Sequence, residues 1–194
     1  MRYLVVYAHP VEDSYAAALH RRVIQTLTEA GHEVDDCDLY AEGFQPVLAR
    51  AERQAYHQVG RNTSHAEKEI ERLKRAEGLV FVFPTWWYGL PAILKGYLDR
   101  VWLPGVAFEV DNGRTRPLLH NIVRFAVVTT YGSPWWLNFF VVRDPGRHML
   151  MRGIRYLFSP KVRTLYLARY GMDYVDTATR ERFLTKVGQR LRDF

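Results

Sequence analysis

The stretch LVFVFPTWWYGLPAILKG, residues 79 to 96, joins an apolar run to a helix-like segment through a turn with three large aromatic residues. The run Leu79–Phe83 is continuously apolar, as expected of a strand buried on both faces of a parallel sheet. Pro91 occupies a favoured first position of a helix, and Pro104 ends the helical pattern. The stretch therefore predicts a strand–turn–helix unit. Large aromatics are unusual in such a turn, because turns lie at the surface and favour small polar residues.

Four further apolar runs have the character of strands, and helical patterns lie between them. Strands are expected at Tyr3–Ala8, Glu33–Leu39, Ile122–Thr130 and Val162–Ala168. Helices are expected at Ala16–Ala30, His65–Ala76, Pro134–Arg155 and Thr177–Leu191, in addition to the helix that begins at Pro91. Strand and helix alternate throughout the 194 residues without an internal repeat or a low-complexity linker. The sequence therefore predicts a single α/β domain, residues 1–194, with a parallel sheet.

The excess of positive charge does not indicate a protein that binds nucleic acid. The chain carries 27 Lys and Arg residues against 21 Asp and Glu, which gives a net charge of +6. The basic residues are scattered, and no run of like charge resembles a basic tail. Scattered positive charge is better explained by solubility or by an anionic small-molecule partner such as a nucleotide.

The cysteine content and the absence of long apolar stretches favour a cytoplasmic protein. Cys37 is the single cysteine and has no intrachain partner, which favours a reducing compartment. No stretch approaches the roughly 20 apolar residues of a membrane span. The opening sequence MRYLVVYAHP has an apolar core too short for a signal peptide. We therefore expect no integral membrane segment.

The segment between the second strand and the second helix, residues 41–65, is longer than an ordinary connection. It carries Phe44, Val47 and Tyr56, so we expect it to pack against the rest of the molecule. Two interpretations remain open. The segment is either a surface excursion that covers the sheet edge or a flap beside a ligand or a second subunit.

In an open parallel sheet a ligand binds outside the carboxyl ends of the strands, so the residues that follow each strand are the candidates. The first strand leads into AHPVEDSYAAAL, which places Ser14 at the start of the first helix. Free backbone N–H groups and the helix dipole attract an anion there. Taken alone, Ser14 is better explained as an ordinary N-cap residue than as a phosphate ligand, and His9 is also compatible with a structural role. The loop matches neither a Walker motif nor GxGxxG.

The third and fourth strands end in an aromatic turn, residues 84–89, and in a turn rich in hydroxyl groups and glycine, residues 129–134. A planar, partly apolar ring system with a phosphate tail would use all three strand ends, because aromatic faces stack on rings and hydroxyl or N–H groups bind their polar edges. A flavin fits this description better than an adenine nucleotide alone. The alternative, that the three aromatics belong to the core, is disfavoured because Pro84 and Gly89 mark a turn.

Three stretches resemble the flavodoxin-like NAD(P)H:quinone oxidoreductase family, which includes mammalian quinone reductases, bacterial drug-activity modulators and ancillary subunits of potassium efflux systems. They are YAHPVEDSYAAAL at 7–19, FPTWWYGLPAILKGYLDRVWLPGVAF at 83–108 and TTYG at 129–132. The resemblance covers most of the chain in the same motif order and weakens after about Gly132. It implies a flavodoxin-like, doubly wound, five-stranded parallel sheet of order 2-1-3-4-5 with helices on both faces.

The resemblance assigns the three loops to parts of a flavin, residue by residue. The phosphate side corresponds to His9, Ser14, Tyr15 and Ala16; the loop under the isoalloxazine ring to Pro84, Thr85, Trp86, Trp87 and Tyr88; and the loop at the pyrimidine edge to Thr129, Thr130, Tyr131 and Gly132. Mammalian members carry a tyrosine and a histidine beyond the glycine turn. This chain has His148 but no tyrosine at matching spacing, so no catalytic residue is assigned, and no metal site is expected.

The resemblance implies a flavin-dependent NAD(P)H oxidoreductase that reduces quinones or related electrophilic aromatics by ping-pong hydride transfer. The motif spacing most resembles that of the FAD-using quinone reductases, which implies FAD rather than FMN, and the resemblance does not distinguish NADH from NADPH. A homodimer with its pockets at the interface is implied by related dimers and by a group of aromatics near the third and fourth strand ends. This group comprises Trp102, Phe108, Trp135, Trp136, Phe139 and Phe140. The alternatives are a regulatory ancillary subunit of a potassium efflux transporter and a flavodoxin-type electron carrier, although such carriers are commonly acidic.

Overall fold

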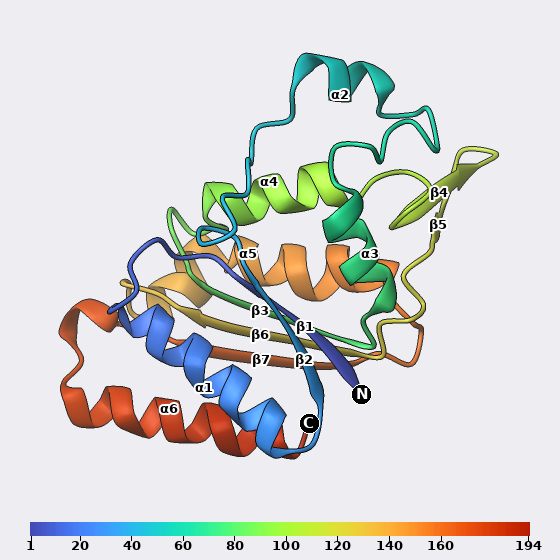
Figure 1. Ribbon diagram of the computed structural model, residues 1–194. Coiled ribbons are helices and arrows are strands. Elements are labelled where there is room, and N and C mark those ends of the chain that lie inside the picture. Colours follow the sequence, from blue (N-terminus) through green and yellow to red (C-terminus); the bar gives the residue numbers. More distant parts are fainter.

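A five-stranded parallel sheet forms the centre of the computed structural model, which describes residues 1–194 (Figure 1). Its strands are β1 (Arg2–Tyr7), β2 (Glu33–Asp38), β3 (Gly78–Pro84), β6 (Arg124–Thr130) and β7 (Arg163–Arg169). They lie in the order β2-β1-β3-β6-β7, and every neighbouring pair is parallel. Counted along the chain, this is the order 2-1-3-4-5, so the predicted flavodoxin-like fold is confirmed.

Helices cover both faces of the sheet. One face carries α1 (Tyr15–Glu29) and α6 (Thr177–Arg192), which lie below the sheet in Figure 1. The other face carries α3 (Glu67–Arg75), α4 (Ala92–Val101) and α5 (Pro145–His148), while α2 (Arg50–Ala55) lies further out. Shorter helical turns occupy Leu137–Val142, Met149–Gly153, Ile154–Leu157 and Met172–Tyr174. None of the helices is both long enough and apolar enough to cross a membrane.

The core consists of two hydrophobic clusters, one on each face of the sheet. Along β1, Leu4 and Val6 pack into a cluster of 28 buried residues under α3 and α4, whereas Val5 packs into a cluster of 17 buried residues under α1 and α6. This alternation follows from the two-residue period of a strand. Each buried Val or Leu side chain stabilises the fold by roughly 1.5–3 kcal/mol. Since the central strands carry such side chains on both faces, helices must cover both faces of the sheet to bury them.

The structure corrects two expectations about the second half of the chain. A short antiparallel hairpin, β4 (Phe108–Asp111) and β5 (Arg114–Pro117), was not expected from the sequence. The helix expected at Pro134–Arg155 is interrupted at Arg143 and Asp144, which both have left-handed backbone angles, φ of 62° and 42°. Pro145 accounts for the break, because proline has no N–H group and disfavours helical angles in the residue before it.

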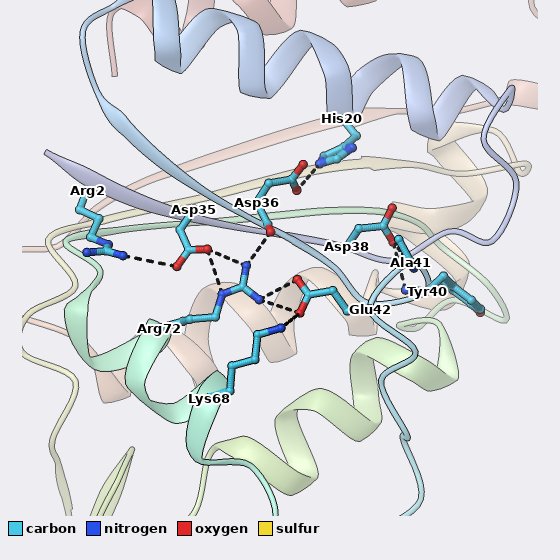
Figure 2. A network of polar contacts seen from close by, with 10 residues as sticks. All are labelled: Arg2, His20, Asp35, Asp36, Asp38, Tyr40, Ala41, Glu42, Lys68 and Arg72. Carbon is cyan, nitrogen blue, oxygen red and sulfur yellow. Dashed lines mark hydrogen bonds and ion pairs between the residues drawn. The ribbon is translucent and has the colours of Figure 1, made fainter.

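The edge strand β2 is polar, and a cluster of ion pairs holds it against α3 (Figure 2). The Arg72 guanidinium donates hydrogen bonds to the Asp35 carboxylate at 2.6 and 2.9 Å and to the Glu42 carboxylate at 2.8 Å. Burial raises the pKa of the neighbouring Cys37 thiol to about 12, so this group stays protonated. Where β2 ends, an Asp38 carboxylate oxygen accepts hydrogen bonds from two following backbone N–H groups, both at 3.0 Å. The start of the 41–65 segment is therefore fixed at the sheet edge.

The 41–65 segment packs against α4 of its own chain. A Cβ atom at Gly96 in α4 would lie 2.4 Å from Pro46 Cα, so only glycine permits this close approach. Further along, the Asn62 amide donates a hydrogen bond to the Pro104 carbonyl at 2.9 Å. The expectation of a packed segment is confirmed. Its outer surface still exposes Val47 and Val59, so a role beside a second subunit stays a prediction.

Candidate functional site

The three predicted loops meet at one edge of the sheet. Strands β1, β3 and β6 are direct neighbours, and Pro84 at the end of β3 pairs in register with Thr130 at the end of β6. The carboxyl ends of parallel strands share one edge, which is where open α/β sheets bind ligands. The loops after these strands therefore form a single candidate site.

The aromatic turn has a strained backbone. Trp86 and Gly89 exchange two backbone hydrogen bonds, of 3.2 and 3.0 Å, and the two residues between them, Trp87 and Tyr88, have φ angles of 51° and 59°. Such a turn ordinarily has asparagine and glycine at its centre, and each bulky residue held there costs about 1–3 kcal/mol. The Trp87 side chain is 98% exposed and gains no burial in return. The Trp87 ring is thus held in a strained turn without packing against the hydrophobic core. Such an exposed ring is suited to contact a ligand.

A cavity of about 250 Å³ lies beside this turn. It is lined by Thr85, Trp87, Tyr88, Tyr131, Gly132 and Ser133. The Thr85 hydroxyl forms a hydrogen bond of 3.0 Å with the buried Thr129 hydroxyl, which ties the floor of the cavity to β6. The site thus combines aromatic faces with hydroxyl and backbone polar groups, the combination that a ring system with one polar edge requires.

The N-terminus of α1 provides a second feature, a candidate anion site. Ser14 is the N-cap, and its hydroxyl accepts a hydrogen bond from the Ala17 N–H at 3.1 Å. The N–H groups of Tyr15 and Ala16 have no acceptor within the chain. Free N–H groups at a helix start, together with the helix dipole, favour a phosphate. Ser14 is therefore a true N-cap, and the helix start that it caps keeps free donors for an anion.

The other residues predicted for the phosphate side, Tyr15, Ala16 and His9, make different contacts. The Tyr15 hydroxyl donates a hydrogen bond to the Arg180 carbonyl at 2.7 Å, and burial raises its pKa to about 12. The Ala16 side chain is buried in the core. These two residues can therefore meet a phosphate through backbone N–H groups alone. A nitrogen of the His9 ring accepts a hydrogen bond from the Val11 N–H, and the ring lies 5.9 Å from the Trp86 ring, so His9 links the first loop to the aromatic turn.

Two arginines near the Tyr15 side chain were missed by reasoning from the sequence. The positive charges of Arg169 and Arg180 oppose the rise in the pKa of the Tyr15 hydroxyl, so both lie within electrostatic reach of that hydroxyl. The Arg169 Nε atom is buried and has no hydrogen-bond partner in the chain. A signal for Arg169 existed, because it is the last residue of β7 and thus lies at a strand end. Two cations and free N–H groups fit a phosphorylated cofactor.

Fold and site together define a flavodoxin-like α/β protein with a candidate cofactor site at the carboxyl ends of its strands. The chain belongs to the family described as having a flavodoxin-like fold, whose model matches residues 1–141. The resemblance to flavodoxin-like NAD(P)H:quinone oxidoreductases that the motifs indicated is thereby confirmed, and relatives in this family are named as enzymes.

Three proteins illustrate these relationships. A Haemophilus influenzae protein named as an uncharacterized NAD(P)H oxidoreductase is 38% identical over 155 residues, which cover 79% of this chain and 76% of that protein. NAD(P)H dehydrogenase (quinone) 1 of Rattus norvegicus is 30% identical over 148 residues, which cover 68% of this chain and 54% of the rat protein. The solved NAD(P)H:quinone oxidoreductase of Methanothermobacter marburgensis has a TM-score of 0.83 and 25% identity, with coverage of 100% and 98%. The chain thus spans about half the length of the rat enzyme.

Proposed function

We propose that this protein is a flavin-dependent NAD(P)H oxidoreductase that reduces quinones or related electrophilic aromatics. The observation that carries the proposal is the strained aromatic turn at Trp86–Gly89, which places an exposed indole beside a polar-edged cavity. The free N–H groups at the start of α1 lie at the end of the neighbouring strand, where the phosphate of the same cofactor would bind.

The flavin, when bound, supplies the hydride chemistry, and the protein supplies binding and orientation. Trp87 and Tyr88 provide a wall against which a flat ring packs. Gly132 and Ser133 in the loop after β6 line the same cavity and would meet the polar edge of that ring. The nicotinamide donor and the quinone acceptor are both flat rings, so one slot would serve them in turn, as a ping-pong cycle requires. His148 is exposed and lines no cavity wall at the site, so no role as acid or base is given to it.

FAD is favoured over FMN by the charges at the phosphate end. Arg169 and Arg180 bring two positive charges near the side chain of Tyr15, the first residue of α1, and two cations suit a diphosphate better than a single phosphate. FMN is the alternative. The single cysteine, Cys37, is buried and unpaired, in keeping with the reducing cytoplasm that we propose as the location.

The decisive measurement is the absorbance spectrum of the purified protein, followed by identification of the released cofactor by mass. We expect a flavin spectrum and quinone-dependent oxidation of NAD(P)H. In the Trp87→Ala variant, flavin affinity should fall roughly tenfold, because stacked aromatic contacts contribute about 0.5–1.5 kcal/mol beyond the area that they bury. The fold should be unaffected, since the side chain is 98% exposed.

Tyr156→Ala is the matched control, because Tyr156 is also exposed, at 59%, but lies outside the cavity and outside the exposed aromatic cluster at residues 135–140. Unchanged flavin affinity together with unchanged quinone turnover in Trp87→Ala would reject the assignment of the aromatic turn to the ring. A protein that neither carries flavin nor takes it up would reject the proposed function as a whole.

We further propose a homodimer, which is supported by apolar surface near the site. Trp135, Trp136 and Phe140 are 56%, 52% and 74% exposed, and an exposed aromatic cluster of this kind commonly marks an interface. Two members of the expected group prove to be internal. Trp102 is buried among core aromatics because its ring packs against Phe81 and Phe158, and Phe108 is partly buried against the same core.

The dimer prediction is checked by light scattering on the flavin-loaded protein. We expect twice the chain mass of 22.7 kDa at micromolar concentration. Replacing Trp136 and Phe140 together by serine should shift the mass toward that of one chain, because both side chains would lose apolar contact area. A wild-type monomer with full quinone reductase activity would contradict the shared pocket.

A further inference from the structure

A buried carboxylate lies next to the candidate ring site. Asp144 is 2% exposed and occupies the break between the π-helical turn Leu137–Val142 and α5. Its two carboxylate oxygens accept hydrogen bonds from the Tyr131 hydroxyl at 2.7 Å and from the Tyr170 hydroxyl at 3.1 Å, and one of them also accepts from the Arg147 N–H at 3.3 Å. None of the ion pairs of the structure includes Asp144.

The hydroxyl groups around Asp144 form a directed network. Because Tyr131 donates its one proton to Asp144, the Tyr166 hydroxyl, 2.6 Å away, must donate to Tyr131. Burial raises the pKa values of Tyr131, Tyr166 and Tyr170, and the negative charge of Asp144 raises them further. The three tyrosines therefore remain neutral donors at any ordinary pH.

Asp144 joins the ends of two strands. Tyr131 directly follows β6 and Tyr170 directly follows β7, and their rings stack with centroids 4.6 Å apart at an angle of 24°. The backbone of Tyr131 is also fixed, since its N–H group donates to the Arg169 carbonyl at 2.8 Å and its carbonyl accepts from the Met172 N–H at 2.9 Å. The carboxylate thus anchors the loop that continues into Gly132.

The same turn also contacts the aromatic side of the cavity. A Cβ atom at Gly146, two residues after Asp144, would lie 3.2 Å from the Tyr88 carbonyl oxygen. Tyr131 and Tyr88 both line the cavity. Asp144 is therefore linked to both walls through short contacts. A buried charge without an ion-pair partner is a costly way to hold two loops, because apolar residues of similar volume would do so at lower cost.

We propose that Asp144 is a positioning residue of the redox site: its buried negative charge, acting through Tyr131, fixes the loop at the polar edge of the flavin and lowers the reduction potential of the bound flavin. A fixed negative charge disfavours the addition of electrons to a nearby group, and its effect is large where water is excluded. This inference rests on the proposed function, since it requires a flavin in the 250 Å³ cavity.

The test is the midpoint potential of the flavin in the loaded Asp144→Asn variant. Asparagine keeps the shape and removes the charge, so the potential should shift to a more positive value. Asp176→Asn is the control, because Asp176 is an N-cap at α6 that asparagine can replace, and its charge lies at an exposed position. Its potential should equal that of the wild type.

A second variant, Tyr131→Phe, keeps the stacked ring and removes its hydroxyl link to Asp144. Flavin affinity should fall roughly tenfold, because a hydrogen bond to a charged group anchors the loop. If Asp144→Asn does not fold, Tyr131→Phe decides, and unchanged potential and affinity in it would overturn the inference. An unchanged potential in folded Asp144→Asn would also overturn it while leaving the proposed function intact. A wild type without flavin would instead reject the proposed function and the inference together.

Discussion

The Arg100→Met variant is expected to lose about 1–3 kcal/mol of unfolding free energy, because it leaves the partly buried Glu52 carboxylate without its guanidinium partner. Arg100 in α4 is 9% exposed, and its Nε and Nη2 atoms donate to the two carboxylate oxygens of Glu52 at 3.0 and 2.6 Å. Its Nη1 atom donates to the Gln45 carbonyl, and its guanidinium lies 5.5 Å from the centre of the Phe44 ring. One side chain thus holds much of the 41–65 segment against the domain.

Urea unfolding measures this loss, and Lys95→Met is the matched control. Lys95 pairs with Asp99 on the same helix, but both side chains are about half exposed, so the pair contributes only about 0.3–0.5 kcal/mol. Hydrogen exchange should show faster exchange of the amides of residues 41–65 in Arg100→Met, and little change in β1 or β3. A loss for Arg100→Met no larger than for Lys95→Met would show that the segment is held by its apolar contacts alone.

The stability difference between wild type and Arg100→Met should also depend on pH. Hydrogen bonds from Arg100 lower the pKa of Glu52 in the folded protein below its unfolded value of about 4.3. A lowered folded pKa contributes stability above the unfolded pKa, and this contribution disappears as the pH falls through the folded value. The difference should therefore be full at pH 7 and shrink below about pH 4. A constant difference over this range would contradict the account.

The sheet, and the meeting of the three candidate loops at one of its edges, could be predicted from the sequence, because both depend on local signals. Continuous apolar runs such as Leu79–Phe83 identify central strands, and the strand-end rule then locates a site without knowledge of side-chain contacts. The hairpin Phe108–Pro117 did carry a local signal, which was overlooked. Its first strand alternates apolar and polar residues, and Asn112 and Gly113, which form its two-residue loop with φ angles of 49° and 75°, are the pair typical of a hairpin turn.

The polar interior of the site could not be predicted from the sequence, because it depends on tertiary contacts. Asp144 lies 13 residues from Tyr131 and 26 from Tyr170 along the chain, and only the pairing of β6 with β7 brings the two tyrosines together. Composition was similarly uninformative about Trp102. An aromatic after a helix is compatible with a core or an interface, and only packing against neighbouring rings distinguishes them.

Ser14→Asp is expected to weaken flavin binding by roughly tenfold to a hundredfold while leaving the fold intact. Serine, asparagine and aspartate are about equally good N-caps, so the first turn of α1 keeps its cap when Ser14 is replaced by aspartate. Two unit charges of like sign about 4 Å apart repel by about 4 kcal/mol at an effective dielectric constant of 20. Because Ser14 is half-buried, solvent and salt reduce this repulsion, and the expected loss is about 1.4–2.8 kcal/mol.

Ser14→Asn separates charge from capping, since it keeps the cap and adds no charge. Titration of each apoprotein with FAD and with FMN should give wild-type affinity for Ser14→Asn and weaker binding for Ser14→Asp, by a factor that decreases as salt is added. A larger loss for FAD than for FMN is expected, because a diphosphate brings more negative charge to the helix start. Equal affinities of the two variants for both flavins would place the phosphate away from α1 and leave the free N–H groups of Tyr15 and Ala16 without a ligand.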